Sequence, residues 1–167
     1  MSIPSLTLEV CLPSRLVATA LCPELQVLTD GVVTLRLPRP GDAQLLVEGR
    51  DDEFFRWLGP GAEIPNPVAC VWAGDELVGW VDYDVGRDWL RPGEVNVGYY
   101  LFRAARGKGY ASRAVELLLL HLGDETEHNV ATLLIHPENE RSLRLARRLR
   151  FVARGQVDGE LFFARSV

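Results

Sequence analysis

The sequence has 167 residues, of which 47% are hydrophobic and 25% charged, and these values are typical of one ordinary globular domain. The formal net charge of -5 argues against a general nucleic-acid-binding protein, because such proteins are usually basic. It is compatible with a cationic ligand such as an amine. The cysteines Cys11, Cys22 and Cys70 are widely spaced and odd in number, so we expect free thiols and no metal site.

Targeting and membrane signals are weak. The N-terminus lacks a basic region followed by an apolar run, so no signal peptide is expected. The run of leucines at 117–120 is far too short to span a bilayer. We therefore expect a cytoplasmic protein without a membrane partner.

The first half of the chain predicts strands and two short helices. Residues 1–25 are expected to form an N-terminal extension or an edge segment, with strand-like alternation at 6–10, and residues 26–167 to form a single domain. A strand is predicted at 33–37, then a helix from Asp42, a candidate cap, to about 47, and a second helix at 52–57. Strands at 68–72 and 77–83 follow, joined by a tight turn at Gly74-Asp75.

The second half alternates between strands and helices. Residues 94–101 alternate as a strand, and apolar residues then recur at helical spacing from 111 to 122, with Gly123 as the predicted stop. A buried strand at 130–135, a helix at 138–149 and a hairpin with strands at 151–157 and 160–164 complete the pattern. This order predicts an α/β sandwich with a mixed sheet.

A glycine-rich turn between a strand and a helix carries the strongest functional signal. Free backbone N–H groups in such a turn, backed by the positive end of the helix, form a phosphate site. Gly107 and Gly109 let the backbone approach an anion, and Arg103, Arg106 and Lys108 add positive charge. The alternative is an ordinary helix-entry turn with solvated basic residues.

The turn also nearly matches the dinucleotide-binding fingerprint GxGxxG, as Gly107-x-Gly109-x-x-Ser112. Two features count against that function. The third small position is a serine, and the strand at 130–135 has no acidic residue at its end to hold a ribose. A nucleotide-binding oxidoreductase is therefore the weakest of the hypotheses.

The motif Arg106-x-x-Gly109-x-Ala111 resembles the phosphate-binding motif of the GNAT acetyltransferase superfamily. The segment 97–101 and the second motif Asn139-x-x-Ser142, followed by Leu149-Arg150-Phe151, are similar to the branch that contains the ribosomal-protein N-terminal acetyltransferases. The resemblance covers about residues 26–165. It implies a GNAT-like mixed central sheet flanked by helices and splayed at an acyl-CoA cleft.

This resemblance implies transfer of an acetyl or related short acyl group from acyl-CoA to a primary amine by direct attack in a ternary complex. A backbone N–H at Gly98 or Tyr99 would polarise the thioester carbonyl, and Ser142 would protonate the leaving thiolate. The expected cofactor-binding residues are Leu101, Phe102, Arg103, Arg106, Gly107, Lys108, Gly109, Tyr110, Ala111, Ser112, Asn139 and Ser142. The amine would belong to a small molecule or a protein N-terminus, and a homodimer is a candidate assembly.

The chain departs from the family pattern in two places. The branch commonly has an acid where this chain has Asn96, so Glu94, two residues earlier on the same strand face, is the candidate base; the alternative is an exposed edge carboxylate. Arg150 replaces the usual glycine of the second motif and is expected to alter a helix end. Candidate substrate contacts are Phe54, Trp57, Trp89 and Asn96. The missing acid also allows a non-catalytic acyl-CoA-binding module.

Overall fold

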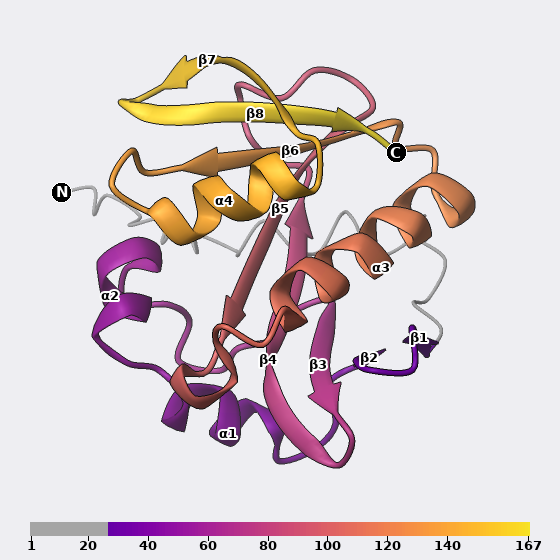
Figure 1. Cartoon of the computed structure of the whole chain (residues 1–167), viewed down its shortest axis with the longest axis vertical. Coiled ribbons are helices and arrows are strands. Elements are labelled where there is room, and N and C mark those ends of the chain that lie inside the picture. The colour runs from indigo at the N-terminus through magenta and orange to yellow at the C-terminus, as the bar shows by residue number, and fades with distance from the viewer. Residues whose placement is uncertain (1–26) are drawn as a thin grey trace, which may run out of the picture.

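The computed structural model describes residues 27–167 (Figure 1). The expectations for residues 1–25 lie outside this range. In chain order the elements are β1 (Leu28–Thr29), β2 (Thr34–Arg36), α1 (Asp42–Glu48), α2 (Asp52–Leu58), β3 (Ala69–Ala73), β4 (Glu76–Asp84), β5 (Glu94–Leu101), the 3₁₀ helix η2 (Arg103–Ala105), α3 (Tyr110–Glu125), β6 (Val130–Ile135), α4 (Glu140–Arg148), β7 (Val152–Val157) and β8 (Glu160–Ser166).

The strands form one mixed sheet with the order β1-β2-β3-β4-β5-β6-β8-β7. Each neighbouring pair is antiparallel except β5 and β6, which are parallel. A parallel pair needs a long crossover connection, and α3 supplies it by crossing the sheet between the two strands (Figure 1). The predicted mixed α/β fold is confirmed.

Helices cover both faces of the sheet, as the alternation along β3 shows. Val71 packs into the larger core together with Val115 and Leu118 of α3, and α4 contributes to the same core. Cys70, the next residue along β3, points to the other face and packs with Leu46 of α1. Complete burial of a leucine such as Leu118 stabilises the fold by roughly 2 kcal/mol.

Two predicted helix boundaries were wrong. Gly123 lies inside α3 and does not end it, and a Cβ at this position would lie 2.8 Å from the carbonyl carbon of Val167. Its small size therefore serves packing. Asp42 is the first residue of α1 and not its cap; its Oδ2 accepts a hydrogen bond from the backbone N–H of Arg39 at 2.8 Å, and Gly41 occupies the cap position.

The end of α4 keeps the backbone geometry that a glycine usually adopts. The N–H of Phe151 donates to the carbonyl of Ala146 at 2.9 Å, and the N–H of Arg150 donates to that of Arg147 at 3.1 Å. These two bonds define a Schellman motif, which places Arg150 in the left-handed region with φ 60°. The expectation that Arg150 would alter the helix end was wrong, because the arginine adopts the glycine conformation.

We predict that Arg150→Gly stabilises the protein. The left-handed conformation costs a non-glycine residue about 1–2 kcal/mol, and the greater freedom of glycine in the unfolded chain offsets part of the gain. The free energy of unfolding, measured by urea titration, should rise by about 0.5–1 kcal/mol. Arg147→Gly, inside the last turn of α4, is the control and should lower it by up to about 1 kcal/mol. A fall in both variants would contradict this account.

Candidate active site

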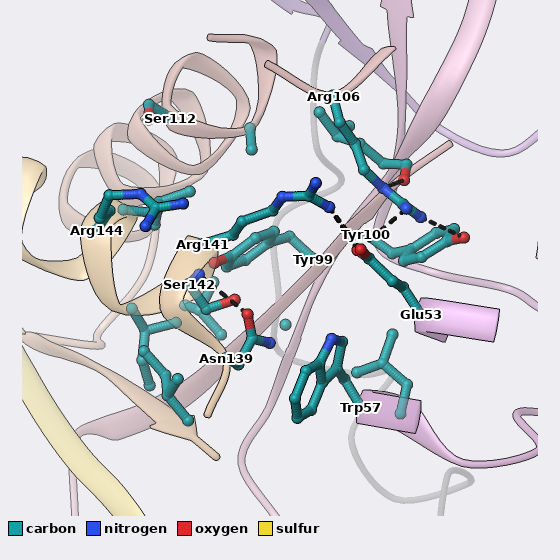
Figure 2. A pocket seen from close by; sticks show the side chains of 18 of the residues that line it. Glu53, Trp57, Tyr99, Tyr100, Arg106, Ser112, Asn139, Arg141, Ser142 and Arg144 are labelled. Atoms are coloured by element: carbon teal, nitrogen blue, oxygen red, sulfur yellow. Dashed lines mark hydrogen bonds and ion pairs between the residues drawn. The ribbon is translucent and has the colours of Figure 1, made fainter. Parts of the chain in front are cut away.

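A cavity opens where β5 and β6 separate. The two strands pair only at Glu94–Val130, Val95–Ala131 and Asn96–Thr132, and the Thr132 hydroxyl donates to the carbonyl of Val95 at 2.9 Å near the end of this pairing. Beyond it lies a cavity of about 350 Å³. It is bounded by the later halves of β5 and β6, by α2, by the first turn of α3 and by one face of α4 along its length (Figure 2).

The backbone of β5 presents alternate N–H groups to this cavity. The N–H of Phe102 donates to Val78 of β4 at 2.9 Å, and Tyr100 is the residue opposite Trp80. In an antiparallel pair alternate residues face the same neighbour, so the peptide groups of Tyr99 and Leu101 face the β6 side, where pairing has ended. Of the two N–H groups predicted to polarise a carbonyl, that of Tyr99 therefore faces the cavity and that of Gly98 faces β4.

The glycine turn exposes a run of free backbone donors. Gly107 and Gly109 have φ 79° and 83°, and Gly109 begins α3 without a side-chain cap. The N–H of Arg106 donates to the carbonyl of Arg103 at 3.3 Å. Within the described part of the chain, no protein group accepts from the N–H groups of residues 107–112. Such a turn at a helix N-terminus is suited to an anion.

The side chain of Arg106 does not point into the space in front of this turn. Its guanidinium donates to Glu53 at 3.1 Å and to the Tyr100 hydroxyl at 2.8 Å (Figure 2). It also donates to the Asp51 carboxylate at 3.0 Å. Its Nε donates to the carbonyl of Leu101 at 2.9 Å. Arg106 thus joins α2 to the end of β5, which differs from the predicted contact between its charge and a phosphate.

Asp51 is the acidic centre of this network. It caps α2 by accepting from the N–H of Phe54 at 3.1 Å, and it also accepts from the Tyr100 hydroxyl at 2.8 Å. The hydrogen bonds from Arg106, more than any other cause, hold the pKa of Asp51 well below its usual range. Burial, followed by the bond to Asp51, raises the pKa of Tyr100 to about 12.

The second motif lies on the opposite wall. The Asn139 side-chain oxygen accepts from the N–H of Ser142 at 3.2 Å and so caps α4, which explains the three-residue spacing. No group of residues 27–167 accepts a hydrogen bond from the Asn139 amide nitrogen. Burial raises the pKa of the Tyr99 phenol to about 12, and the neighbouring Ser142 hydroxyl partly opposes this shift. Tyr99 therefore stays protonated at neutral pH and can act as a donor.

The structure brings most of the predicted site residues to the cavity. Of the predicted cofactor contacts, Phe102, Arg103 and Lys108 do not line it. Phe102 instead packs beside Gly49, where a Cβ would lie 2.2 Å from its ring. The Lys108 ammonium lies 6.0 Å from the ring centre of Tyr110. The predicted residues that line the cavity are Trp57, Gly98, Tyr99, Leu101, Arg106, Gly107, Gly109, Tyr110, Ala111, Ser112, Asn139 and Ser142.

Four other predicted residues do not line the cavity. Glu94, the predicted base, is buried; it forms an ion pair with Arg154 at 2.6 Å and accepts from the N–H of Arg91 at 3.1 Å. Its carboxylate is therefore occupied at the far end of β5. Asn96 lies within the paired part of the sheet, whereas Phe54 and Trp89 pack against Tyr100 and Phe162 respectively. None of these four residues therefore lies at the cavity, where the sequence predicted the base and the substrate contacts.

Two acidic residues of the cavity were not singled out from the sequence, and His136, which precedes Pro137, was expected to be structural. Glu53 of α2 and Glu160 of β8 both line the cavity, and the carboxylate of Glu160 forms no hydrogen bond or ion pair with residues 27–167. His136 lies 5.3 Å from the ring of Trp57, and its Nδ1 accepts from the N–H of Glu138 at 3.2 Å. No motif marks these residues, because Glu160 reaches the cavity only when β8 pairs beside β6, and Glu53 only when α2 docks against the sheet.

The described residues contain neither a cluster of metal-binding side chains nor a membrane-spanning helix. No group of three histidine, cysteine or acidic side chains in the range 27–167 is arranged to hold a metal ion. Over the same range, no helix combines the length and apolar character needed to cross a membrane.

The sequence also matches a known family. Residues 65–152, more than half of the chain, match the sequence model of the acetyltransferase (GNAT) domain. The chain therefore belongs to the GNAT acetyltransferase family, and the resemblance based on Arg106-x-x-Gly109-x-Ala111 is confirmed. A search of curated proteins found no match.

Solved structures share the fold. RimL, the ribosomal L7/L12 alpha-N-protein acetyltransferase in complex with coenzyme A, superimposes with a TM-score of 0.70 and 16% identity over 85% of this chain and 98% of that chain. RimJ of Mycobacterium smegmatis, in complex with CoA-disulfide, gives 0.65 and 20% over 82% and 83%. The microcin C7 self-immunity acetyltransferase MccE, with acetyl-CoA and AMP, gives 0.67 and 17% over 83% and 94%.

We predict that Asp51→Asn flattens the acid dependence of stability. The folded-state pKa of Asp51 is depressed, so its ionised form stabilises the fold above the unfolded pKa near 3.8, and this contribution is lost as the pH falls. Urea midpoints from about pH 6 down to about pH 3 should fall less steeply in the variant than in the parent. Asp52→Asn, at the exposed neighbouring position, should keep the parent slope. An unchanged slope in Asp51→Asn would contradict the assignment.

Proposed function

We propose that the protein transfers an acetyl or related short acyl group from acyl-CoA to a primary amine, by direct attack of the amine in a ternary complex. One observation carries the proposal. A turn with unoccupied backbone donors adjoins a cavity that runs between two separated strands of a GNAT fold. The structural neighbours RimL, RimJ and MccE hold coenzyme A, a CoA disulfide or acetyl-CoA, which supports acyl-CoA as the co-substrate.

The N–H groups of residues 107–112 would receive the diphosphate, because their direction and the helix dipole favour an anion. The pantetheine arm would then lie along the open edge of β5. There the N–H of Leu101 is available, whereas its carbonyl is occupied by Arg106. The Asn139 amide would donate to the arm from the opposite wall. These contacts position the thioester near Tyr99 and Ser142.

In the chemical step, the amine nitrogen forms a bond to the thioester carbonyl carbon, and the carbon–sulfur bond breaks. The Tyr99 N–H would stabilise the negative charge that develops on the carbonyl oxygen. The departing sulfur takes a proton from the Ser142 hydroxyl, which lies beside the protonated phenol of Tyr99, and the proton that the amine releases restores the hydroxyl. The products are an amide and the free thiol of coenzyme A.

The amine must also lose a proton. Glu160 is the best placed group, because it lines the cavity and its carboxylate is not paired with any residue from 27 to 167. We therefore propose Glu160 as the base in place of Glu94. His136 is less suited to this role, since its Nδ1 already accepts a hydrogen bond. RimL is an alpha-N-protein acetyltransferase, so a protein N-terminus is one acceptor class to test beside small amines.

Gly109→Glu should abolish cofactor binding. Two like charges about 5 Å apart at an effective dielectric constant of about 20 repel by about 3 kcal/mol, so acetyl-CoA affinity should fall about a hundredfold or more. Isothermal titration measures this. Gly31→Glu is the matched control, because Gly31 has a similar φ of 85° and equally open surroundings but lies in the β1–β2 turn. Equal losses in both variants, or no binding by the folded parent, would refute the proposed phosphate site.

Glu160→Gln should lower kcat about a hundredfold and leave acetyl-CoA affinity unchanged, as expected for the loss of a general base. Thiol release with a panel of amines measures turnover. Asp158→Asn, in the turn of the same hairpin, is the control and should retain activity. Ser142→Ala should also lower kcat. If neither Glu160→Gln nor Ser142→Ala changes kcat, the proton-transfer roles are wrong.

A different outcome would concern the function itself. If the parent binds acetyl-CoA but no amine reacts, a non-catalytic acyl-CoA-binding module is the better description.

A further inference from the structure

A second cavity of about 350 Å³ adjoins the glycine turn. Its lining combines three guanidinium groups, two from the segment between β5 and α3 and one from α4, with a single carboxylate. Most of these residues also line the main cavity, so the two spaces are continuous around the turn. The lining residues are Glu53, Arg103, Arg106, Gly107 and Arg141.

The three arginines differ in how firmly they are held. The Arg106 side chain is 15% exposed, and its donors are already engaged by neighbouring groups. The Arg103 side chain is 77% exposed and lies 3.5 Å from Asp51. The Arg141 side chain is intermediate at 58%, and within residues 27–167 only its Nη1 has a partner, at 2.7 Å from each oxygen of Glu53. Arg141 is therefore the half-exposed guanidinium that keeps unused donors.

Glu53 is positioned between two cations. It reaches Arg106 at 3.1 Å on one side and Arg141 at 2.7 Å on the other (Figure 2). The ion pair with Arg141 thereby connects α2 to the first turn of α4. Both residues line the second cavity together with Gly107 of the glycine turn. An anion held by the glycine turn would lie close to this carboxylate and would repel it.

We infer that Glu53 holds Arg141 in the free protein and that a phosphate group of acyl-CoA replaces Glu53 on Arg141. A phosphate accepts two parallel N–H bonds from a guanidinium, and the phosphates of acyl-CoA together carry more charge than one carboxylate, so a phosphate is the stronger partner. Arg106 cannot make this exchange, because Asp51, Tyr100 and the Leu101 carbonyl hold it from several sides. This inference rests on the proposed binding of acyl-CoA.

Charge-neutralising variants separate this role from the other roles that the ion pair could have. If Arg141 changes partner, removing Glu53 removes a competitor and removing Arg141 removes a ligand, so the two changes act in opposite directions on affinity. If the ion pair only obstructed access to the cavity, both variants would bind coenzyme A more tightly. If it only maintained the shape of the binding site, both variants would bind more weakly. The sign of the two effects therefore decides between the three.

The experiment is isothermal titration of coenzyme A into the full-length parent, Glu53→Gln, Arg141→Gln, the double variant and Glu138→Gln. Glu138 is the matched control, because its ion pair with Arg56 at 2.9 Å also connects α2 to the segment before α4 but lines neither cavity. Glu53→Gln should tighten binding about two- to fivefold, as for one partly exposed ion pair. Arg141→Gln should weaken it about tenfold. The double variant should resemble Arg141→Gln, and the control should match the parent.

Effects of the same sign for Glu53→Gln and Arg141→Gln would overturn the inference, and so would an unchanged affinity in Arg141→Gln. Absence of coenzyme A binding by the parent would refute the proposed function itself. Titrations with dephospho-CoA and 4′-phosphopantetheine identify the phosphate. If Arg141→Gln also weakens the binding of dephospho-CoA, which lacks the 3′-phosphate, Arg141 contacts the diphosphate side. If the affinity for dephospho-CoA is unchanged in this variant, Arg141 contacts the 3′-phosphate. A loss of the same size with pantetheine, which has no phosphate, would exclude the exchange.

Discussion

The end of the pairing between β5 and β6 is the constraint on which the rest of the site depends. The strands are parallel and pair as far as Asn96 and Thr132, and from there each strand has one open edge facing the other. Backbone groups at an open edge need partners, and a ligand that enters the gap can supply them. The later residues of β5, the turn after it and the first turns of α3 and α4 all border the gap that this divergence creates.

Arg106 has a structural role in this region, because it holds α2 against the end of β5. Its position in the phosphate-binding motif predicts contact with an anion, but its guanidinium is committed to Asp51, Glu53 and Tyr100. Removing one partner of such a partly buried guanidinium is destabilising, because it leaves a charge without compensation. The motif therefore combines two tasks. Its glycines leave the backbone donors open, and its arginine fixes α2 against the strand that precedes them.

Much of the fold was predictable because it depends on local patterns. The alternation from 94 to 101 predicted β5 correctly, and the apolar run from 130 to 135 predicted β6. The boundaries that failed depend on distant contacts. Gly123 looks like a helix stop, but its role is to make room for Val167, which is 44 positions away in sequence. The conformation of Arg150 was also hidden, because the surrounding helix end imposes a φ that arginine rarely adopts.

In the candidate site, too, the features set by local sequence were predictable and those set by tertiary contacts were not. The glycine turn and Asn139-x-x-Ser142 were recognisable, since each is a local backbone device at a helix start. Glu94 was chosen from its place on the strand face, but its ion pair with Arg154 of β7 is a tertiary contact. Glu160 and Glu53 reach the cavity only through the order of the strands and the docking of α2.

Hydrogen–deuterium exchange with and without acetyl-CoA tests the central claim most directly, because it follows the backbone donors themselves. The account predicts slower exchange on ligand addition at the N–H groups of residues 107–112 and of Tyr99 and Leu101, and no change in the β1–β2 turn. Unchanged exchange at 107–112 in a sample saturated with acetyl-CoA would contradict it.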